Sequence, residues 1–346
     1  MDGTFYPQVA GSPQPVPCRV VVAVPVRDES ERLNRLLSAL AVAACRSGCQ
    51  VSALILANNC SDGTAALSCA FRHPALTVET VEIAFPAAQA SAGRARRLAM
   101  DLALRDDALL MTTDGDAMPA PDWIAAAMRH VAAGADVVCG TIGADAWHVL
   151  ATPSGARIAA AEGAYGALVH EIRHCLDRMA GRQSLDGPQP HYMESGAAIA
   201  IRADAYRAIG GLPHVASSED RALIHRAERH GLRICYASDM HSHVSARLIG
   251  RAKGGMAECL RRRMVEDDPL ADQAMLPAVL LRQLWDRAMA GDALPYPDRS
   301  VAHGARLRAS VLERDLGCLT AFVESRVRPD FARWLDAMSA PAVAVA

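Results

Sequence analysis

Between residues 19 and 113 the sequence alternates short apolar runs with segments of helical periodicity, and this alternation restricts the folds open to the chain. The short runs are predicted strands and the periodic segments are predicted helices. The strands lie at 19–25, 51–57, 76–84 and 108–113, and the helices at 31–44 and 91–104. Ser30 is expected to cap the first helix. Strands separated by helices at this spacing predict βαβ units and a mixed, mainly parallel sheet flanked by helices.

Polar residues follow three of the predicted strands. They occupy residues 25–29, 58–64 and 114–116, directly after the first, second and fourth strands. In open α/β sheets ligands bind beyond the carboxyl ends of the strands. The three polar clusters are therefore predicted to converge on one edge of the sheet.

The rest of the chain divides at about residue 256. Before it, helices are predicted at 162–181 and 217–231, and strands at 196–201 and 232–237. After it, the sequence predicts a helical C-terminal extension rich in arginine and leucine. Residues 1–17 contain four prolines and are expected to form an extended arm.

Composition narrows the class of protein. The 346 residues are 51% apolar and carry a formal net charge of -2, so the chain has no general attraction for nucleic acid. The N-terminus lacks the pattern of a signal peptide, and no uncharged apolar run reaches the roughly 18 residues that span a bilayer. The ten cysteines are scattered, and Cys45, Cys69, Cys139 and Cys235 are expected to be reduced and buried. These features predict a cytoplasmic protein.

The sequence TTDGDAMP places Asp114 and Asp116 one residue apart after a predicted strand. A divalent cation between them would offset their repulsion, and Mn²⁺ and Mg²⁺ both accept carboxylate oxygens. Gly115 is expected to let the backbone turn sharply between the two acids. The alternative is a solvated Asp-Gly turn without a metal.

Further metal or phosphate ligands are predicted after the final strand of the sheet. His241 and His243 follow that strand, and an imidazole ligand would favour Mn²⁺ over Mg²⁺. Arg247, Arg251 and Lys253 lie among glycines and are expected to form a mobile basic flap over a diphosphate. A solvated basic helix start is an equally simple interpretation.

Five stretches occur in the order seen in GT-A fold glycosyltransferases of family 2, which this chain resembles over residues 18–255. They are VVVAVPVRDESERLNRLLSAL, ANNCSDGT, TTDGDAMP, ESGAAIAIRADAYRAIGGL and SSEDRALIHRAERHG. The resemblance implies a nucleotide-binding half at 18–142 and an acceptor-binding half at 143–255.

The resemblance also implies roles for residues of the donor site. Pro25, Arg27, Asp28 and Glu29 would lie against the nucleoside, with Asn58 in the second loop and Asp62 reaching the base. Asp114 would contact ribose or metal, and Asp116 would bind the metal. Arg94 and Arg97 would approach the donor sugar or phosphate, unless they form a solvated helix face. The first loop reads PVRDE where the family often has PVYNE, which leaves the base open between uridine and guanosine.

Inverting transfer requires a general base that removes the proton of the acceptor hydroxyl. The resemblance assigns this role to Asp220, with Glu219 beside it, and implies that Glu194, Ser195 and Gly196 lie on the acceptor side. Ser217 and Asp220 also have the spacing of a capping box, which is the competing structural interpretation. Retaining transfer stays open.

Two other classes of function are weighed against the glycosyltransferase. A non-catalytic module of the same fold would bind nucleotide or a partner without turnover. A nucleotidyltransferase would carry a glycine-rich loop after its first strand, and a dehydrogenase would carry G-x-G-x-x-G; VPVRDES matches neither. The predicted partners are a nucleotide-diphosphate sugar and an unknown acceptor. The C-terminal helices are expected to pack on the domain or form a homodimer, and peripheral membrane contact stays open.

Overall fold

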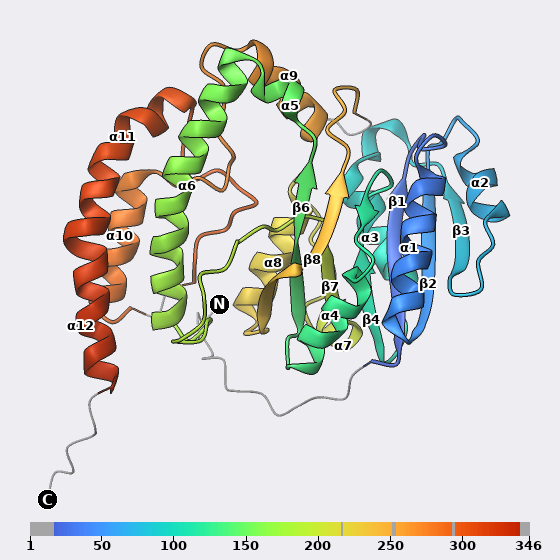
Figure 1. Ribbon diagram of the computed structural model, residues 1–346, viewed down its shortest axis with the longest axis horizontal. Coiled ribbons are helices and arrows are strands. Elements are labelled where there is room, and N and C mark those ends of the chain that lie inside the picture. Colours follow the sequence, from blue (N-terminus) through green and yellow to red (C-terminus); the bar gives the residue numbers. More distant parts are fainter. Residues whose placement is uncertain (1–16, 216, 251–253, 293–294, 340–346) are drawn as a thin grey trace, which may run out of the picture.

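The computed structural model describes residues 17–215, 217–250, 254–292 and 295–339 (Figure 1). Eight strands form one sheet in the order β3-β2-β1-β4-β7-β6-β8-β5. The strands are β1 (Arg19–Val26), β2 (Gln50–Asn58), β3 (Thr77–Ile83), β4 (Ala108–Thr112), β5 (Met118–Pro119), β6 (Val137–Ala144), β7 (Ile199–Arg202) and β8 (Ile234–Val244). Strands β1 to β4 pair in parallel, as do β6 and β8, whereas β7 is antiparallel to both its neighbours and β5 to β8. The predicted mixed, mainly parallel sheet is confirmed.

Helices cover both faces of this sheet (Figure 1). They are α1 (Leu33–Ser47), α2 (Thr64–Ala70), α3 (Ala92–Ala103), α4 (Trp123–Ala132), α7 (Ala203–Ala208) and α8 (Glu219–Arg229). Alternate residues of β1 enter opposite cores, as the strand period of two requires. Val20 and Val22 pack with α1, α2 and α4, while Val21 and Ala23 pack with α3, α7 and α8.

The remaining helices form a separate layer (Figure 1). They are α5 (Trp147–Leu150), α6 (Pro153–Met179), α9 (Met256–Val265), α10 (Ala278–Met289), α11 (Ala309–Phe322) and α12 (Arg328–Ser339), with a π-helical turn at Val323–Val327. A 3-10 turn at Ala87–Gln89 lies elsewhere, between β3 and α3. The long helix α6 shares one apolar core with α10, α11 and α12. The predicted helical C-terminal extension is confirmed, and it is packed against a helix from the middle of the chain.

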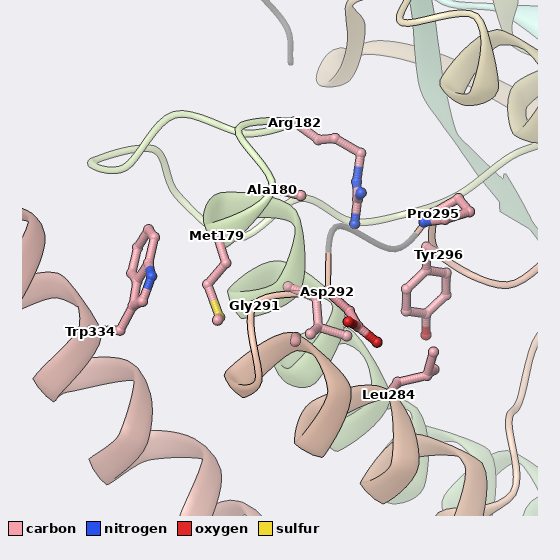
Figure 2. Close-up of a pocket in the computed structure, with 11 residues that line it drawn as sticks. Met179, Ala180, Arg182, Leu284, Gly291, Asp292, Pro295, Tyr296 and Trp334 are labelled. Atoms are coloured by element: carbon pink, nitrogen blue, oxygen red, sulfur yellow. The ribbon is translucent and has the colours of Figure 1, made fainter. Parts of the chain in front are cut away.

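The extension and α6 enclose a cavity of about 180 Å³ (Figure 2). Its walls are mainly apolar, from Met179, Leu284 and Trp334, and Arg182 and Asp292 also line it. The C-terminal end of α6 borders it, whereas the start of α6 adjoins the carboxyl ends of β6 and β8 (Figure 1). In the described part of the chain, no helix combines the length and apolar character needed to cross a membrane.

Two local predictions were wrong, and the competing interpretation of the residues before α8 is not supported. Ser30 does not cap α1, because the helix begins after Arg32 and has no side-chain cap. The serines before α8 form no capping box: its N-cap is Ser218, in a left-handed conformation and without a side-chain cap bond. All ten cysteines are free, as expected, but of the four predicted to be buried only Cys139 is buried. Cys235 is partly exposed, and Cys45 and Cys69 are exposed because each lies on the outer face of its helix.

Candidate active site

The polar loops after β1, β2 and β4 meet at one edge of the sheet, as predicted. Arg19 at the start of β1 aligns with Gln50 of β2 and with Ala108 of β4, so the three parallel strands end close together. Asn58 lies at the end of β2 and donates from Nδ2 to the Val26 carbonyl at 2.8 Å. This bond fixes the ends of β1 and β2 relative to each other.

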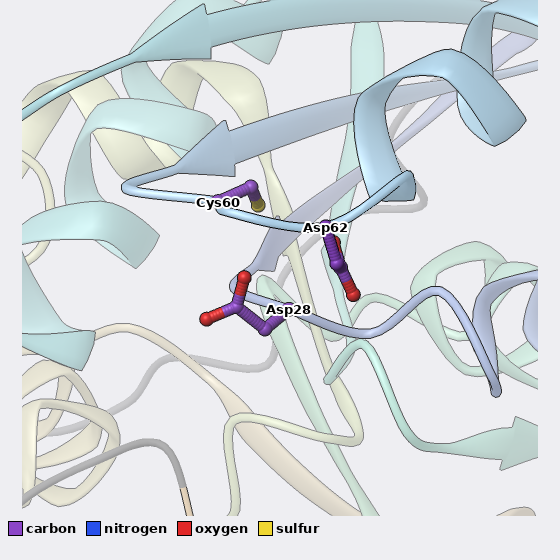
Figure 3. A group of neighbouring side chains, drawn as sticks. All are labelled: Asp28, Cys60 and Asp62. Carbon is purple, nitrogen blue, oxygen red and sulfur yellow. The ribbon is translucent and has the colours of Figure 1, made fainter.

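The first two loops bring Asp28, Cys60 and Asp62 together (Figure 3). A potential ligand atom from each residue lies within 4.8 Å of the other two. Asp28, with a left-handed φ of 51°, accepts bonds from the Ser61 amide at 2.7 Å and the Ser61 hydroxyl at 3.1 Å. These bonds join the loops that the resemblance assigns to the nucleoside.

Asp62 is held ionised by its neighbours. Its carboxylate accepts bonds from the Thr64 amide and hydroxyl and from the Ser30 amide. Desolvation opposes ionisation, but these hydrogen bonds outweigh it and lower the pKa of Asp62 to about 2. The exposed Asp62 side chain is therefore a permanent hydrogen-bond acceptor at the predicted base site.

Glu29 ends the first loop and is buried, whereas Pro25 is partly exposed and Arg27 is exposed. The Glu29 amide donates to Thr64 Oγ1 at 2.8 Å. Its carboxylate receives both terminal nitrogens of Arg247, one of them at 2.8 Å. Glu29 therefore holds Arg247 in place, in addition to lying in the loop that is predicted to contact the nucleoside.

Arg96 on α3 is the central cation of the site, and the sequence analysis missed it. This buried guanidinium contacts Asp114 Oδ1 at 2.5 Å and Glu219 Oε1 at 3.1 Å. It also donates to Thr112 Oγ1 at 3.0 Å and to the Gly196 carbonyl at 2.9 Å. Arg96 thus joins the acidic pair, the start of α8 and the loop before β7.

The sequence contained a signal for Arg96. The buried positions of α3 include Ala95, Ala99 and Met100, and Arg96 lies on the same stripe of the helix. An arginine on an otherwise apolar helix face must find buried partners. Arg94 instead bonds Gln89 and stacks on Phe85, away from the acids.

Arg97 is also directed elsewhere: it donates to the Leu212 carbonyl and pairs with Asp101. The predicted approach of Arg94 and Arg97 to the donor has no support in these contacts, since neither side chain contacts Asp114 or Asp116 through the described bonds. Arg251 and Lys253 lie outside the described residues. Within the predicted flap, Arg247 alone can be placed.

Asp116 lies near both positive and negative side chains at this edge of the sheet. Its Oδ2 lies 3.4 Å from a terminal nitrogen of Arg247. Desolvation, followed by the nearby charge of Asp114, raises the pKa of Asp116 to about 6, although Arg247 opposes the shift. The positive charge of Arg247 is therefore not enough to offset the burial of the Asp116 carboxylate and the negative charge of Asp114.

The backbone turns at Gly115, as expected, but the need for glycine there comes from close packing against β1. A Cβ at this position would lie 2.8 Å from Val26 Cγ1 and 3.2 Å from Glu29 Cγ. Its φ is not in the left-handed region. Close packing of the acidic loop on the end of β1 thus excludes larger residues.

The two histidines lie within β8 rather than after it, because this strand continues to Val244. His243 and Asp116 line the same cavity, of about 340 Å³, together with Asp145. His243 Nε2 is 3.4 Å from Asp145 Oδ2, whereas His241 Nδ1 bonds Thr141 Oγ1 at 3.0 Å. His243 is thus the histidine placed with Asp116.

Asp220 lies at the start of α8 and faces the loop before β7. Its Oδ2 accepts a bond from the Gly196 amide at 3.0 Å, and its Oδ1 accepts one from the Arg221 amide at 2.8 Å. Desolvation, followed by the charge of Glu219, raises the pKa of Asp220 to about 6 against the opposing charges of Arg96 and Arg221. A carboxylate with this pKa is ionised at neutral pH and still basic enough to accept a proton.

Glu219 is the charged partner of Arg96 and is buried. Ser195 Oγ accepts a bond from the Ala197 amide at 3.3 Å. Glu194 is sealed in a different cluster, where it bonds Arg173, Arg299 and Tyr236. The Glu194 carboxylate is thus not available to an acceptor in this structure, because its oxygens are already shared among buried donors.

A sequence model of the family described as Glycosyltransferase like family 2 matches residues 17–253. The chain belongs to this family of glycosyltransferases. No curated protein matches the chain significantly.

Solved glycosyltransferases resemble this one at low sequence identity. The mannosyltransferase PcManGT from Pyrobaculum calidifontis, in complex with GDP-Man and Mn²⁺, is 17% identical with a TM-score of 0.49, covering 99% of this chain and 80% of that one. TarS residues 1–349 from S. aureus, with UDP-GlcNAc, is 12% identical with a TM-score of 0.44, covering 89% and 73%.

A third structure is glucosyl-3-phosphoglycerate synthase from Mycobacterium tuberculosis, in complex with Mg²⁺ and UDP. It is 14% identical with a TM-score of 0.38, covering 71% of this glycosyltransferase and 78% of that chain.

The donor edge is the edge of the sheet where the loops after β1, β2 and β4 meet Arg96, Glu219 and Arg247. Its ion-paired carboxylates outnumber its guanidiniums. Four carboxylates share two guanidiniums, those of Arg96 and Arg247. The carboxylates are Glu29, Asp114, Asp116 and Glu219. Within these ion pairs, four negative and two positive charges leave a formal surplus of two negative charges. The count leaves out Asp220, beside Glu219, and Arg32, Arg35 and Asp145, which line the cavity beside Asp116. Oxygen ligands with a surplus of two charges suit a single divalent cation.

Proposed function

We propose that this glycosyltransferase transfers a sugar from a nucleoside-diphosphate sugar to an acceptor hydroxyl, with a divalent cation and with inversion at the anomeric carbon. The proposal rests on the arrangement of carboxylates at the donor edge. A carboxylate cluster deficient in positive charge lies beside Asp220, whose raised pKa suits a general base.

Asp116 would hold the cation, with Asp114 and His243 as the nearest further ligands. A bound Mn²⁺ or Mg²⁺ supplies a Lewis acid that stabilises the charge of a leaving diphosphate. Arg247 would contact the same diphosphate, because its guanidinium reaches Asp116 from the loop after β8. Asp28 and Asp62 would accept hydrogen bonds from the nucleoside.

Asp220 would accept the proton of the acceptor hydroxyl. The Gly196 amide and the Arg221 amide bond different oxygens of this carboxylate and fix its plane. Glu219 is committed to Arg96, so it contributes charge near the base rather than a second proton acceptor. Ser195 and Gly196 lie on the side from which the acceptor would approach.

The C-terminal extension would complete this site by holding α8. Asp272 Oδ2 accepts a bond from Arg221 at 2.8 Å, and Gln273 Nε2 donates to Ser218 Oγ at 3.2 Å. Both contacts flank Asp220. We therefore keep residues 18–255 as the proposed catalytic domain and 256–346 as an extension that packs on it.

The first experiment is a thermal-shift series with UDP, GDP, CDP and dTDP, each with and without Mn²⁺, on the wild type and on Asp116→Ala. A bound ligand stabilises the fold by RT ln(1 + [L]/Kd). Stabilisation by one diphosphate that requires Mn²⁺ and is lost in the variant supports the proposal and identifies the base. Absence of stabilisation by all four diphosphates would refute it.

A further inference from the structure

A second group of reactive side chains lies outside the donor edge, where β8 passes the end of α4. It consists of Cys235, His130 and Asp239. The register of β8 against β6 shifts at this point: Ala237 aligns with Gly140, but His241 aligns with the next residue, Thr141. The extra residues form a bulge, and Asp239 lies in it.

The imidazole of His130 bridges a thiol and a carboxylate. Cys235 Sγ lies 3.3 Å from His130 Nδ1, and Asp239 Oδ1 lies 2.8 Å from His130 Nε2. The other Asp239 oxygen accepts a bond from Arg129 at 2.8 Å, which fixes the carboxylate. A nucleophile, an imidazole and an orienting acid in this sequence form the arrangement that activates a thiol.

The charge state of the imidazole supports this interpretation. The hydrogen bond with Cys235 and that with Asp239 outweigh desolvation and raise the pKa of His130 to about 9. The imidazole is thus cationic at neutral pH, and a cation beside a thiol favours the thiolate. The other charged or titratable groups near this pair are Arg129 on α4 and the buried Cys139 on β6.

Glycosyl transfer does not use this group. Cys235 is the second residue of β8, whereas His243, near the other end of the strand, lines the cavity with Asp116. Cys235 is partly exposed, and the His130 side chain retains 30% of its surface. The Cys235 side chain also packs against the core on this face of the sheet, and a reagent that reaches it would not pass through the donor site.

We propose that Cys235 is a reactive nucleophile that forms a mixed disulfide with small-molecule disulfides. Its sulfur attacks one sulfur of the disulfide, so a new S–S bond forms as the old one breaks. The other half leaves as a thiolate and takes a proton from solvent. One disulfide replaces another, so no further oxidant is needed.

The test measures native labelling of the full chain by 4,4′-dithiodipyridine, with peptide mapping by mass spectrometry. Cys45 and Cys69 are internal references, because both are more exposed than Cys235. At pH 6 an ordinary thiol with a pKa of about 8.5 is mostly protonated. We expect Cys235 to react roughly tenfold faster than either reference at this pH.

Two substitutions separate activation from structure. His130→Gln should slow Cys235 to the rate of the references, while His73→Gln, an exposed control, should change nothing. Circular dichroism and diphosphate-induced thermal shifts check that both variants fold. The proposal is overturned if wild-type Cys235 reacts more slowly than Cys45 and Cys69 at pH 6. It is equally overturned if a folded His130→Gln variant keeps the wild-type rate.

Discussion

Two clusters of arginine and carboxylate side chains in this protein differ in their balance of ion-paired charges and in their exposure. The donor-edge cluster holds four carboxylates and two guanidiniums and borders a cavity. The interior cluster, between the sheet and the extension, holds three of each. Its members are Arg173, Arg182, Arg299, Asp177, Glu194 and Glu228.

The difference shows in the behaviour of one carboxylate from each cluster. Glu194 is fully desolvated, but Arg299 and Arg173 outweigh that cost and lower its pKa to about 2. Asp116 is also desolvated, and Asp114 adds repulsion, so its pKa rises to about 6. A balanced, sealed cluster holds the structure together, whereas the open cluster has carboxylates that the proposed function assigns to a cation.

The largest expected effect is on catalysis. Asp220→Asn should lower the rate of sugar transfer by roughly 10²- to 10⁴-fold, because the amide cannot accept the proton that a general base removes. Binding of the diphosphate should persist, since the variant leaves Asp116 and Arg247 in place. Release of nucleoside diphosphate from the donor measures the first effect, and thermal shift measures the second. Near-normal turnover would remove Asp220 from the mechanism.

The next effect tests the interior cluster. Arg299→Met leaves Glu194 and Glu228 buried with Arg173 alone, and should reduce the free energy of unfolding by about 3–5 kcal/mol. Urea denaturation measures this change. The matched control is Arg287→Met, which breaks the exposed pair with Asp292 and should cost about 1 kcal/mol or less. Equal losses in the two variants would show that burial does not distinguish these pairs.

The third prediction concerns the sign of a pH effect. The folded pKa of Asp116, about 6, lies above the unfolded value of about 3.9, so its contribution to stability is fully present below pH 4. That contribution is lost as the pH rises through 6. Asp116→Asn should therefore raise the free energy of unfolding at pH 7 by about 3 kcal/mol and leave it nearly unchanged at pH 3.5.

Urea denaturation of the wild type and the Asn variant at several pH values, without metal, isolates this residue from the other titrating groups. A variant that is less stable than the wild type at pH 7 would contradict the surplus of negative charge inferred at the donor edge.

The smallest expected effect is a change in the affinity for Mn²⁺ when Arg247 is replaced. This guanidinium neutralises part of the donor-edge charge, so Arg247→Met should tighten binding of Mn²⁺ alone. A gain of up to about fivefold corresponds to one partly exposed ion pair. Titration followed by the Mn²⁺ electron paramagnetic resonance signal measures it without nucleotide. Weaker binding would mean that Mn²⁺ does not compete with Arg247 for these carboxylates.

Much of the donor edge was predictable because local patterns determine it. Strand and helix periodicities indicated the parallel strands, and parallel strands end at a shared edge. That placed Asp28, Asp62, Asp114 and Asp116 together before any contact was known. Arg96 was not predicted, although helix geometry would have indicated it, since among Arg94, Arg96 and Arg97 only Arg96 lies on the buried stripe of α3.

The sequence by itself determined β1 to β4, β7, the start of β8, the helices α1, α3, α6 and α8, the edge where the polar loops converge and the family. It did so because these depend on spacing over a few residues and on motif order. It did not identify α2, α4, β5 or β6. The tertiary structure alone decided the partners of buried charges. Glu194 bonds Arg299 across 105 residues, and His130 meets Cys235 across 105 as well. Burial makes each such charge depend on whichever distant group the fold brings within hydrogen-bond distance, and no local pattern records that choice.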